Sequence, residues 1–221
     1  MVAANDRSET TEALRATAPG LDDALLAAGR RAVERHGVAR ATLDRIAEEA
    51  GLSRVTLYRR GVTREAVLSA LADGILDDNR RALWPALTAR GTGAERLRRA
   101  LAAICDVAEN NLGVLLALGE RVGAGLGEPP AAGEPAARQA FAEPLERLLR
   151  DGAADGSLRA SDPRETATAL LNLTTWTYVH LRAGSRWSAR RARRATLELA
   201  VRGVAATAEP ASGDLRAPVR R

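Results

Sequence analysis

The sequence contains no lysine and has few aromatic residues, a single cysteine and no long apolar stretch. All 33 basic side chains are arginine, aromatic residues make up 3% of the 221 residues, and Cys105 is the single cysteine. One cysteine excludes an intrachain disulfide and fits a reducing cytoplasm. No stretch approaches about 18 uncharged apolar residues, and the polar N-terminus lacks a signal-peptide run. We therefore expect no contact with a membrane and a cytoplasmic location.

The residues that usually carry catalysis or bind metals are also scarce. His36, His180 and Cys105 are the only histidine and cysteine residues, and they lie too far apart to give a metal-ligand spacing. No glycine-rich phosphate loop follows a strand. A nucleophile pair of Cys105 and His180 has no further support, and Cys105 is more simply a small buried hydrophobe. We expect neither an enzyme nor a bound cofactor.

The charge balance is basic but mixed. The arginines face 28 acidic residues, which gives a formal net charge of +5 and a pI of about 10.6. This balance favours polyanionic partners only weakly, so the clustering of charges is more informative than their total. With 46% hydrophobic residues, the chain is long enough to bury a core in one large domain or two modest ones.

Apolar residues recur at helical spacing along the chain, and no alternating β pattern interrupts them. We therefore predict an all-α fold. The predicted helices cover residues 22–36, 43–50, 54–60, 64 to about 79, 93–110, 112–122, 136–152, 163 to about 183, and a last helix that begins at 188 and that Gly203 ends. Thr42, Ser53 and Thr63 are suited to cap three of these helices. Residues 123–135 are rich in glycine and proline and predict a loop.

The segment from Gly51 to Arg64 combines a turn, a helix cap and positive charge without acids. It contains four arginines and one of the two tyrosines of the chain. Two short helices joined by Gly51-Leu52-Ser53 match a helix-turn-helix, whose second helix enters the major groove of DNA. We expect these arginines to be unpaired within the protein because DNA is their partner.

The second of these helices carries side chains suited to DNA. Arginine can contact guanine, valine and threonine methyl groups can meet thymine methyl groups, and tyrosine can reach sugar, base or phosphate. Leu57 is expected to pack inward. The residues predicted to contact DNA are Thr42, Ser53, Arg54, Val55, Thr56, Tyr58, Arg59, Arg60 and Arg64. The simpler alternative is a solvated basic helix, with Tyr58 covering the rim of a small domain.

Residues from about 25 to 67 contain a set of elements with a specific spacing: Leu25-Leu26, Ala28, Gly37, Thr42, Ile46-Ala47, Ala50-Gly51-Leu52-Ser53, Thr56-Leu57-Tyr58 and Arg64-Glu65. With these elements the segment resembles the DNA-binding domain of the tetracycline-repressor (TetR) family. It implies an N-terminal three-helix DNA-binding domain followed by a C-terminal helical domain for ligand binding and dimerisation. We accordingly predict an arm at 1–20, the helix-turn-helix domain at 21–66, the helical domain at 67–207 and a tail at 208–221.

The chain departs from the family pattern at two positions. Gly61 stands where the family usually has phenylalanine, which removes a core anchor that Val62 and Val67 are expected to replace. Val55 stands where a small residue is usual, so the base preference of relatives does not carry over. Arg64 replaces the usual lysine and keeps the positive charge near the DNA backbone.

A second, denser group of arginines lies towards the C-terminus. Its members are Arg182, Arg186, Arg190, Arg191, Arg193 and Arg194. It could form a second nucleic-acid surface, but the first turn of a helix disfavours cations. We prefer a solvated face or an ion-paired rim, with acids such as Glu128 and Glu134 as partners.

The remaining helices predict an effector site and a dimer face. The residues expected to line a mostly apolar effector pocket are Leu115, Leu118, Phe141, Leu145, Asn172 and Trp176. The alternative for Trp176 is a place in the core. A homodimer is predicted through Leu197, Val201 and Val204, together with Ala189, Ala192, Ala195, Ala200, Leu170, Leu173 and Leu181.

These observations predict a transcriptional regulator that binds double-stranded operator DNA as a homodimer. Repression relieved by a small effector is the expected mode of action. The alternative is a constitutive architectural protein or an activator that has no effector.

Overall fold

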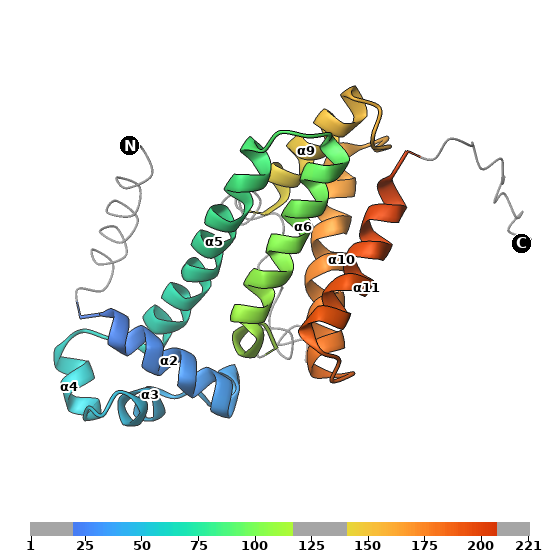
Figure 1. Cartoon of the computed structure of the whole chain (residues 1–221). Coiled ribbons are helices and arrows are strands. Elements are labelled where there is room, and N and C mark those ends of the chain that lie inside the picture. Colours follow the sequence, from blue (N-terminus) through green and yellow to red (C-terminus); the bar gives the residue numbers. More distant parts are fainter. Residues whose placement is uncertain (1–19, 117–140, 207–221) are drawn as a thin grey trace, which may run out of the picture.

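The computed structural model describes residues 20–116 and 141–206, and these ranges are almost entirely helical (Figure 1). The elements are α2 (Asp23–His36), the 3-10 helix η1 (Val38–Arg40), α3 (Leu43–Glu49), α4 (Arg54–Arg59), α5 (Arg64–Thr88), α6 (Gly93–Asn110), α9 (Glu143–Ala154), α10 (Pro163–Ala183) and α11 (Ala189–Val204). Within the described ranges, β-type pairing is limited to an isolated bridge between Leu158 and Ala205. The predicted all-α fold is confirmed.

Side-chain caps set where the N-terminal helices begin. The hydroxyl oxygens of Thr42, Ser53 and Thr63 accept backbone N–H groups of the first turns of α3, α4 and α5, at 3.4, 3.1 and 3.0 Å. Each hydroxyl satisfies a donor that has no partner inside its helix. The three predicted caps are confirmed, and they explain how helices as short as α3 and α4 have fixed starting points.

The predicted end of the long helix near Asn79 is wrong, because α5 continues to Thr88 with Pro85 inside it. A proline removes one helical hydrogen bond and usually bends or ends a helix. Here Leu83 and Ala86 on either side are 1% and 3% exposed, so the burial of this turn outweighs the lost bond. The last helix likewise passes Gly203 and ends at Val204.

Several predictions concern residues outside the described ranges. These are the arm at 1–20, of which only residue 20 is described, the tail at 208–221, most of the helix at 112–122, of which 112–116 is helical, the loop at 123–135 and the start of the helix at 136. In the described ranges, no helix is long and apolar enough to cross a membrane.

Figure 1 shows α2, α3 and α4 at one end of the molecule, with α5 leading from them to the bundle of α6, α9, α10 and α11. The packing is continuous between these parts. Val107 of α6 and Val114 belong to the same buried cluster as Leu25, Ile46 and Leu57 of the N-terminal helices. The predicted division after residue 66 remains a prediction, and the hydrophobic core crosses it.

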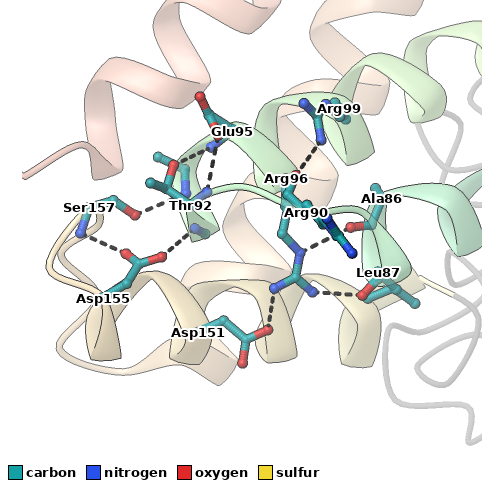
Figure 2. A network of polar contacts seen from close by, with 12 residues as sticks. Ala86, Leu87, Arg90, Thr92, Glu95, Arg96, Arg99, Asp151, Asp155 and Ser157 are labelled. Carbon is teal, nitrogen blue, oxygen red and sulfur yellow. Dashed lines mark hydrogen bonds and ion pairs between the residues drawn. The ribbon is translucent and has the colours of Figure 1, made fainter.

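A polar junction joins α5, α6 and α9 at the other end of α5 (Figure 2). The Arg96 guanidinium donates to the carbonyls of Ala86 and Leu87 at 3.2 and 2.7 Å and to Asp151 at 2.9 Å. It thereby satisfies carbonyls at the end of α5, which have no partner inside the helix. The start of α6 is fixed by the Asp155 carboxylate, which accepts from the Gly93 N–H at 2.6 Å.

Candidate nucleic-acid interface and effector domain

A tight turn between α3 and α4 sets the position of the candidate recognition helix. Gly51 has φ +67°, a left-handed conformation that favours glycine, and the Leu52 N–H donates to the Ala47 carbonyl at 2.9 Å. Leu57 is completely buried in the same cluster as Ile46. Because Leu57 fixes one side of α4 to the core, the opposite side is held towards solvent.

The outward side of α4 exposes residues that a folded protein normally covers. Tyr58 is 81% exposed and Val55 is 59% exposed. At the N-terminus, the Ser53 and Thr56 hydroxyls lie 2.9 Å apart in a mutual hydrogen bond. Tyr58 therefore does not cover the rim of the domain, and α4 presents an amphipathic surface of the kind that meets groove edges and phosphates.

The expectation that the arginines around α4 are unpaired is wrong for most of them. Arg54 pairs with Asp44 of α3 at 3.1 Å, Arg60 with Asp22 at 3.4 Å and Arg64 with the adjacent Glu65 at 3.6 Å. Arg59 has no such partner among the described residues. The segment itself lacks acids, but the fold brings acids from elsewhere to it. Exposed pairs of this kind contribute only about 0–1 kcal/mol, so a phosphate can replace the carboxylate.

Arg64 has a structural role that the sequence did not reveal. Its Nε donates to the Ala41 carbonyl at 2.9 Å and its Nη2 to the Val38 carbonyl at 2.7 Å. Arg64 thus fastens the first turn of α5 to the connection that precedes α3. A contact between Arg64 and the DNA backbone stays a prediction. The partners are main-chain carbonyls more than 20 positions away, so no sequence spacing identifies them.

The core adapts to the absence of an aromatic residue at position 61. Gly61 has φ +69°, and a Cβ atom built there would meet nothing within 4 Å. Val62 and Val67 are 2% and 0% exposed and belong to the N-terminal cluster. The two valines therefore fill the core next to α4, as expected.

The N-terminal helices also bind the end of α6 directly. The Arg30 side chain of α2 donates to Asn111 Oδ1 at 2.6 Å, and Asn111 is 1% exposed. A Cβ atom on Gly113 would lie 2.4 Å from Glu34 of α2, so these segments are in close contact. This contact, which the sequence reading missed, couples the position of α2 to that of α6.

The residues predicted to line an effector pocket are distributed over different clusters in the described ranges. Leu115 packs against two clusters, Phe141 against the N-terminal one, Leu145 lies in the bundle core and Trp176 packs against the cluster around Tyr178. Asn172 is exposed and donates to the Thr168 carbonyl at 2.9 Å. Leu118 lies outside the described residues.

The apolar stripe predicted for the dimer face is mostly buried inside the chain. Leu197 and Val204 are each 6% exposed and belong to the bundle core with Leu170. Both side chains pack within their own chain, so the prediction is wrong for these two residues, whereas Val201 is half-buried and Leu173 of the predicted set is exposed. The large apolar residues that α10 and α11 do expose are Leu173 and Leu199, at 41% and 63%.

Part of the second arginine group is paired with α6. Arg182 makes a two-pronged ion pair with Glu109 at 2.7 and 2.8 Å, and Tyr178 donates to the same carboxylate at 2.8 Å. Hydrogen bonds from Arg182 and from Tyr178 lower the pKa of Glu109, against its partial burial. Arg193 pairs with Asp106 at 2.8 Å. The ion-paired rim is thus confirmed for these two arginines, whereas Glu128 and Glu134 lie outside the described residues.

The few nucleophilic and metal-binding side chains do not gather. Cys105 is completely buried, and this burial raises the pKa of its thiol to about 12. His180 is exposed, with its Nδ1 at 2.8 Å from the Trp176 carbonyl. In the described part of the chain, no group of three or more His, Cys, Asp or Glu residues could hold a metal ion.

Family models match both parts of the chain. Residues 25–71 match bacterial regulatory proteins of the tetR family, and residues 90–204 match the tetracyclin repressor-like C-terminal domain. The second match alone covers more than half of the 221 residues. A search of curated protein sequences finds no match.

Solved structures share the fold at low sequence identity. A TetR family transcriptional regulator, PfmR, from Thermus thermophilus is 23% identical, with a TM-score of 0.66 over 82% of this chain and 98% of that one. The ketosteroid transcriptional regulator of Mycobacterium tuberculosis is 19% identical, with a TM-score of 0.63 over 82% and 93%. AibR, in complex with isovaleryl coenzyme A and operator DNA, is 19% identical, with a TM-score of 0.63 over 80% and 95%.

Proposed function

Since the chain belongs to the TetR family of DNA-binding transcriptional regulators, we propose that it represses transcription as a homodimer bound to a near-palindromic operator. In this proposal a small, mostly apolar effector binds the C-terminal helices and releases the DNA. The alternative, a constitutive architectural protein or activator, differs in having no effector-dependent release.

The surface of α4 carries the DNA-binding part of the proposal. Leu57 anchors one side of this helix, while Val55 and Tyr58 stand out of the opposite side. Arg59 has no partner among the described residues, and the carboxylate of Asp44 that holds Arg54 is itself exposed. A helix that exposes apolar and cationic side chains together gains stability when a groove covers them.

The direct test compares two arginines that differ in position. Arg59→Ala on α4 should weaken binding by roughly 1–3 kcal/mol if Arg59 reads a base. Arg98→Ala removes the same charge from an exposed position of α6, near the end of the bundle away from α4 (Figure 1). Gel-shift titrations on operator fragments recovered by genome-wide capture would decide. Equal affinities of both variants and the parent protein would refute the role of α4.

The homodimer part rests on family membership and on the apolar residues that α10 and α11 leave exposed. Leu173 and Leu199 remain outside the core and can meet a second copy. A two-fold dimer places two copies of α4 so that the operator half-sites are separated by about one helical turn of DNA or a multiple of it. Light scattering at micromolar concentration would test it: Leu173→Glu with Leu199→Glu should give a monomer, and a parent protein already monomeric on and off DNA contradicts the dimer.

The effector part is supported by the fold and by the connection between α2 and α6. A structural neighbour is seen in complex with isovaleryl coenzyme A and operator DNA, so a protein of this fold can bind a small molecule as well as DNA. In the present chain, the Arg30 side chain of α2 donates a hydrogen bond to Asn111 at the end of α6. A ligand that shifts α6 must therefore also shift the N-terminal helices. A coupling of about 1–3 kcal/mol would weaken DNA binding by roughly 5- to 150-fold.

Coupling of this kind is reciprocal, which gives a sharp test. Hits from a thermal-shift screen of apolar compounds would be titrated with and without operator DNA. Operator must weaken ligand binding by the same factor by which ligand weakens operator binding. Arg30→Ala should reduce this factor while it leaves the affinity for each partner alone largely intact. If every hit binds equally well with and without operator, the constitutive alternative is favoured.

A further inference from the structure

Two threonines are buried in the middle of the bundle without hydrogen-bond partners. Thr174 of α10 is 0% exposed and Thr196 of α11 is 1% exposed, and neither hydroxyl finds a partner among the described residues. Helical threonines commonly donate to the carbonyl four residues earlier. Thr168, also on α10, does so to Arg164 at 3.1 Å. The two buried threonines therefore differ from Thr168, whose hydroxyl has a partner.

The two threonines lie at the same level of α10 and α11. One turn before and one turn after Thr174 come Leu170 and Tyr178, which belong to two different apolar clusters. One turn on either side of Thr196 come Ala200 and Ala192, which belong to the same two clusters in matching order. Since α10 and α11 run in opposite directions and pack together (Figure 1), both threonines fall at the boundary between the clusters.

Contacts with α6 confirm this level independently. Tyr178 bonds to Glu109 and Arg193 to Asp106. Thr174 lies one turn before Tyr178 on α10, which runs parallel to α6, and Thr196 lies nearly one turn after Arg193 on α11, which runs antiparallel (Figure 1). Because all helices rise by the same distance per residue, both positions lie opposite about residues 103–105 of α6.

We propose that Thr174 and Thr196 form an internal binding site for the oxygen atom of one small uncharged molecule. Two buried hydroxyls at one level of the bundle, with the uncharged Leu170, Tyr178, Ala192 and Ala200 one turn away from them, select an uncharged hydrogen-bond acceptor. The oxygen can belong to a trapped water molecule or to a hydroxyl or carbonyl compound. Without such a partner, each buried hydroxyl would disfavour folding by roughly 5- to 150-fold. This site does not depend on the proposed regulatory function.

Valine substitutions distinguish one oxygen atom bound by both hydroxyls from two hydroxyls that have no hydrogen-bond partner. If both hydroxyls bind one oxygen, Thr174→Val and Thr196→Val should each raise the unfolding equilibrium constant by roughly 5-fold, because each leaves the oxygen or the other hydroxyl short of a bond. The double variant should recover most of this loss, since it removes both polar groups together. Thr175→Val, on a half-buried position of α10, is the control for the change of side chain.

If the two single variants each stabilise the fold and their effects add, the proposal is overturned, because neither hydroxyl then has a hydrogen-bond partner in the folded protein. Urea unfolding of the full chain at one fixed protein concentration measures all four variants. A crystal structure at about 1.5 Å separates the sources: a single round density peak near both hydroxyls identifies water, and extended density with a retained mass in native mass spectrometry identifies an organic compound. No density near either hydroxyl would also overturn the proposal.

Discussion

The N-terminal helices and the C-terminal bundle differ in where some of their polar side chains lie. Around α4, charged and aromatic groups lie on the surface, and pairs such as Arg54 with Asp44 are open to solvent. The bundle has exposed ion pairs too, but it also encloses polar groups: Tyr178 and Thr174 are 2% and 0% exposed. Surface pairs can be exchanged for a partner at little cost, whereas enclosed ones cannot. The difference indicates that α4 can bind DNA with little rearrangement of the protein interior. A ligand in the bundle can act only by moving the bundle helices.

The largest effect on this comparison is expected from removing Leu57, which holds the buried side of α4 to the core. Leu57→Ala deletes a completely buried side chain and should cost roughly 2–5 kcal/mol of unfolding free energy. DNA binding should be lost, because α4 is no longer held in place. Circular dichroism, urea unfolding and gel shifts would measure this. Operator binding at parental affinity would contradict the anchoring role of Leu57.

Two glycines beside or within the bundle, Gly93 of α6 and Gly74 of α5, differ in the space around them. A Cβ atom on Gly93 would lie 2.2 Å from the Gly152 main chain, so Gly93→Ala should cost roughly 1–3 kcal/mol. Gly74 of α5 meets nothing within 4 Å, so Gly74→Ala should instead stabilise by roughly 0.5–1 kcal/mol. Thermal unfolding of both variants tests the contrast, and two shifts of equal sign would argue against it.

The partly exposed ion pair between Arg182 and Glu109 should contribute to the pH dependence of stability. Arg182 and Tyr178 lower the pKa of Glu109 in the folded protein. The ionised Glu109 carboxylate therefore adds to the free energy of unfolding above its unfolded-state pKa of about 4.3. This contribution is lost as pH falls through its lower folded-state pKa. Glu109→Gln should flatten the acid side of the stability curve measured by urea unfolding between pH 3 and 7. A curve parallel to that of the parent protein would exclude this contribution.

The smallest effect is expected from the surface pair, which a phosphate can replace. Asp44→Asn frees Arg54 and removes a negative charge next to α4. Binding to DNA should tighten by about 0.2–1 kcal/mol, with little change in protein stability. Gel shifts at two salt concentrations would measure the change in affinity for DNA. Glu198→Gln, which removes an exposed acid of α11, is the control. Asp162→Asn is not suitable as a control because Asp162 caps α10. Weaker operator binding by the Asp44 variant would show that the pair positions α4.

The elements that depend on local sequence were predictable. Caps at Thr42, Ser53 and Thr63 act within three residues, and the burial of Leu57 follows from helical periodicity, so both are visible in a short window. The end of α5 was not predictable in the same way. Burial of Leu83 and Ala86 against distant helices overrides the local signal of Pro85.

Partners distant in sequence account for most of the remaining errors. An acid-free segment suggested free arginines, but Asp44 and Asp22 reach them from other helices. The spacing of Leu197 and Val204 correctly predicts an apolar helix face. Periodicity alone does not say whether such a face meets the same chain or a second copy, and burial shows that it meets its own core.

The core cluster shared by the N-terminal helices and α6 has a consequence for how the protein opens. Val107 of α6 and Val114 complete the cluster that holds Leu25 and Leu57. Unfolding of α2 to α4 therefore exposes apolar surface on the bundle as well, so the two parts open as one cooperative unit. Amide hydrogen exchange in α2 should slow whenever α6 is stabilised, even by a compound bound far from α2.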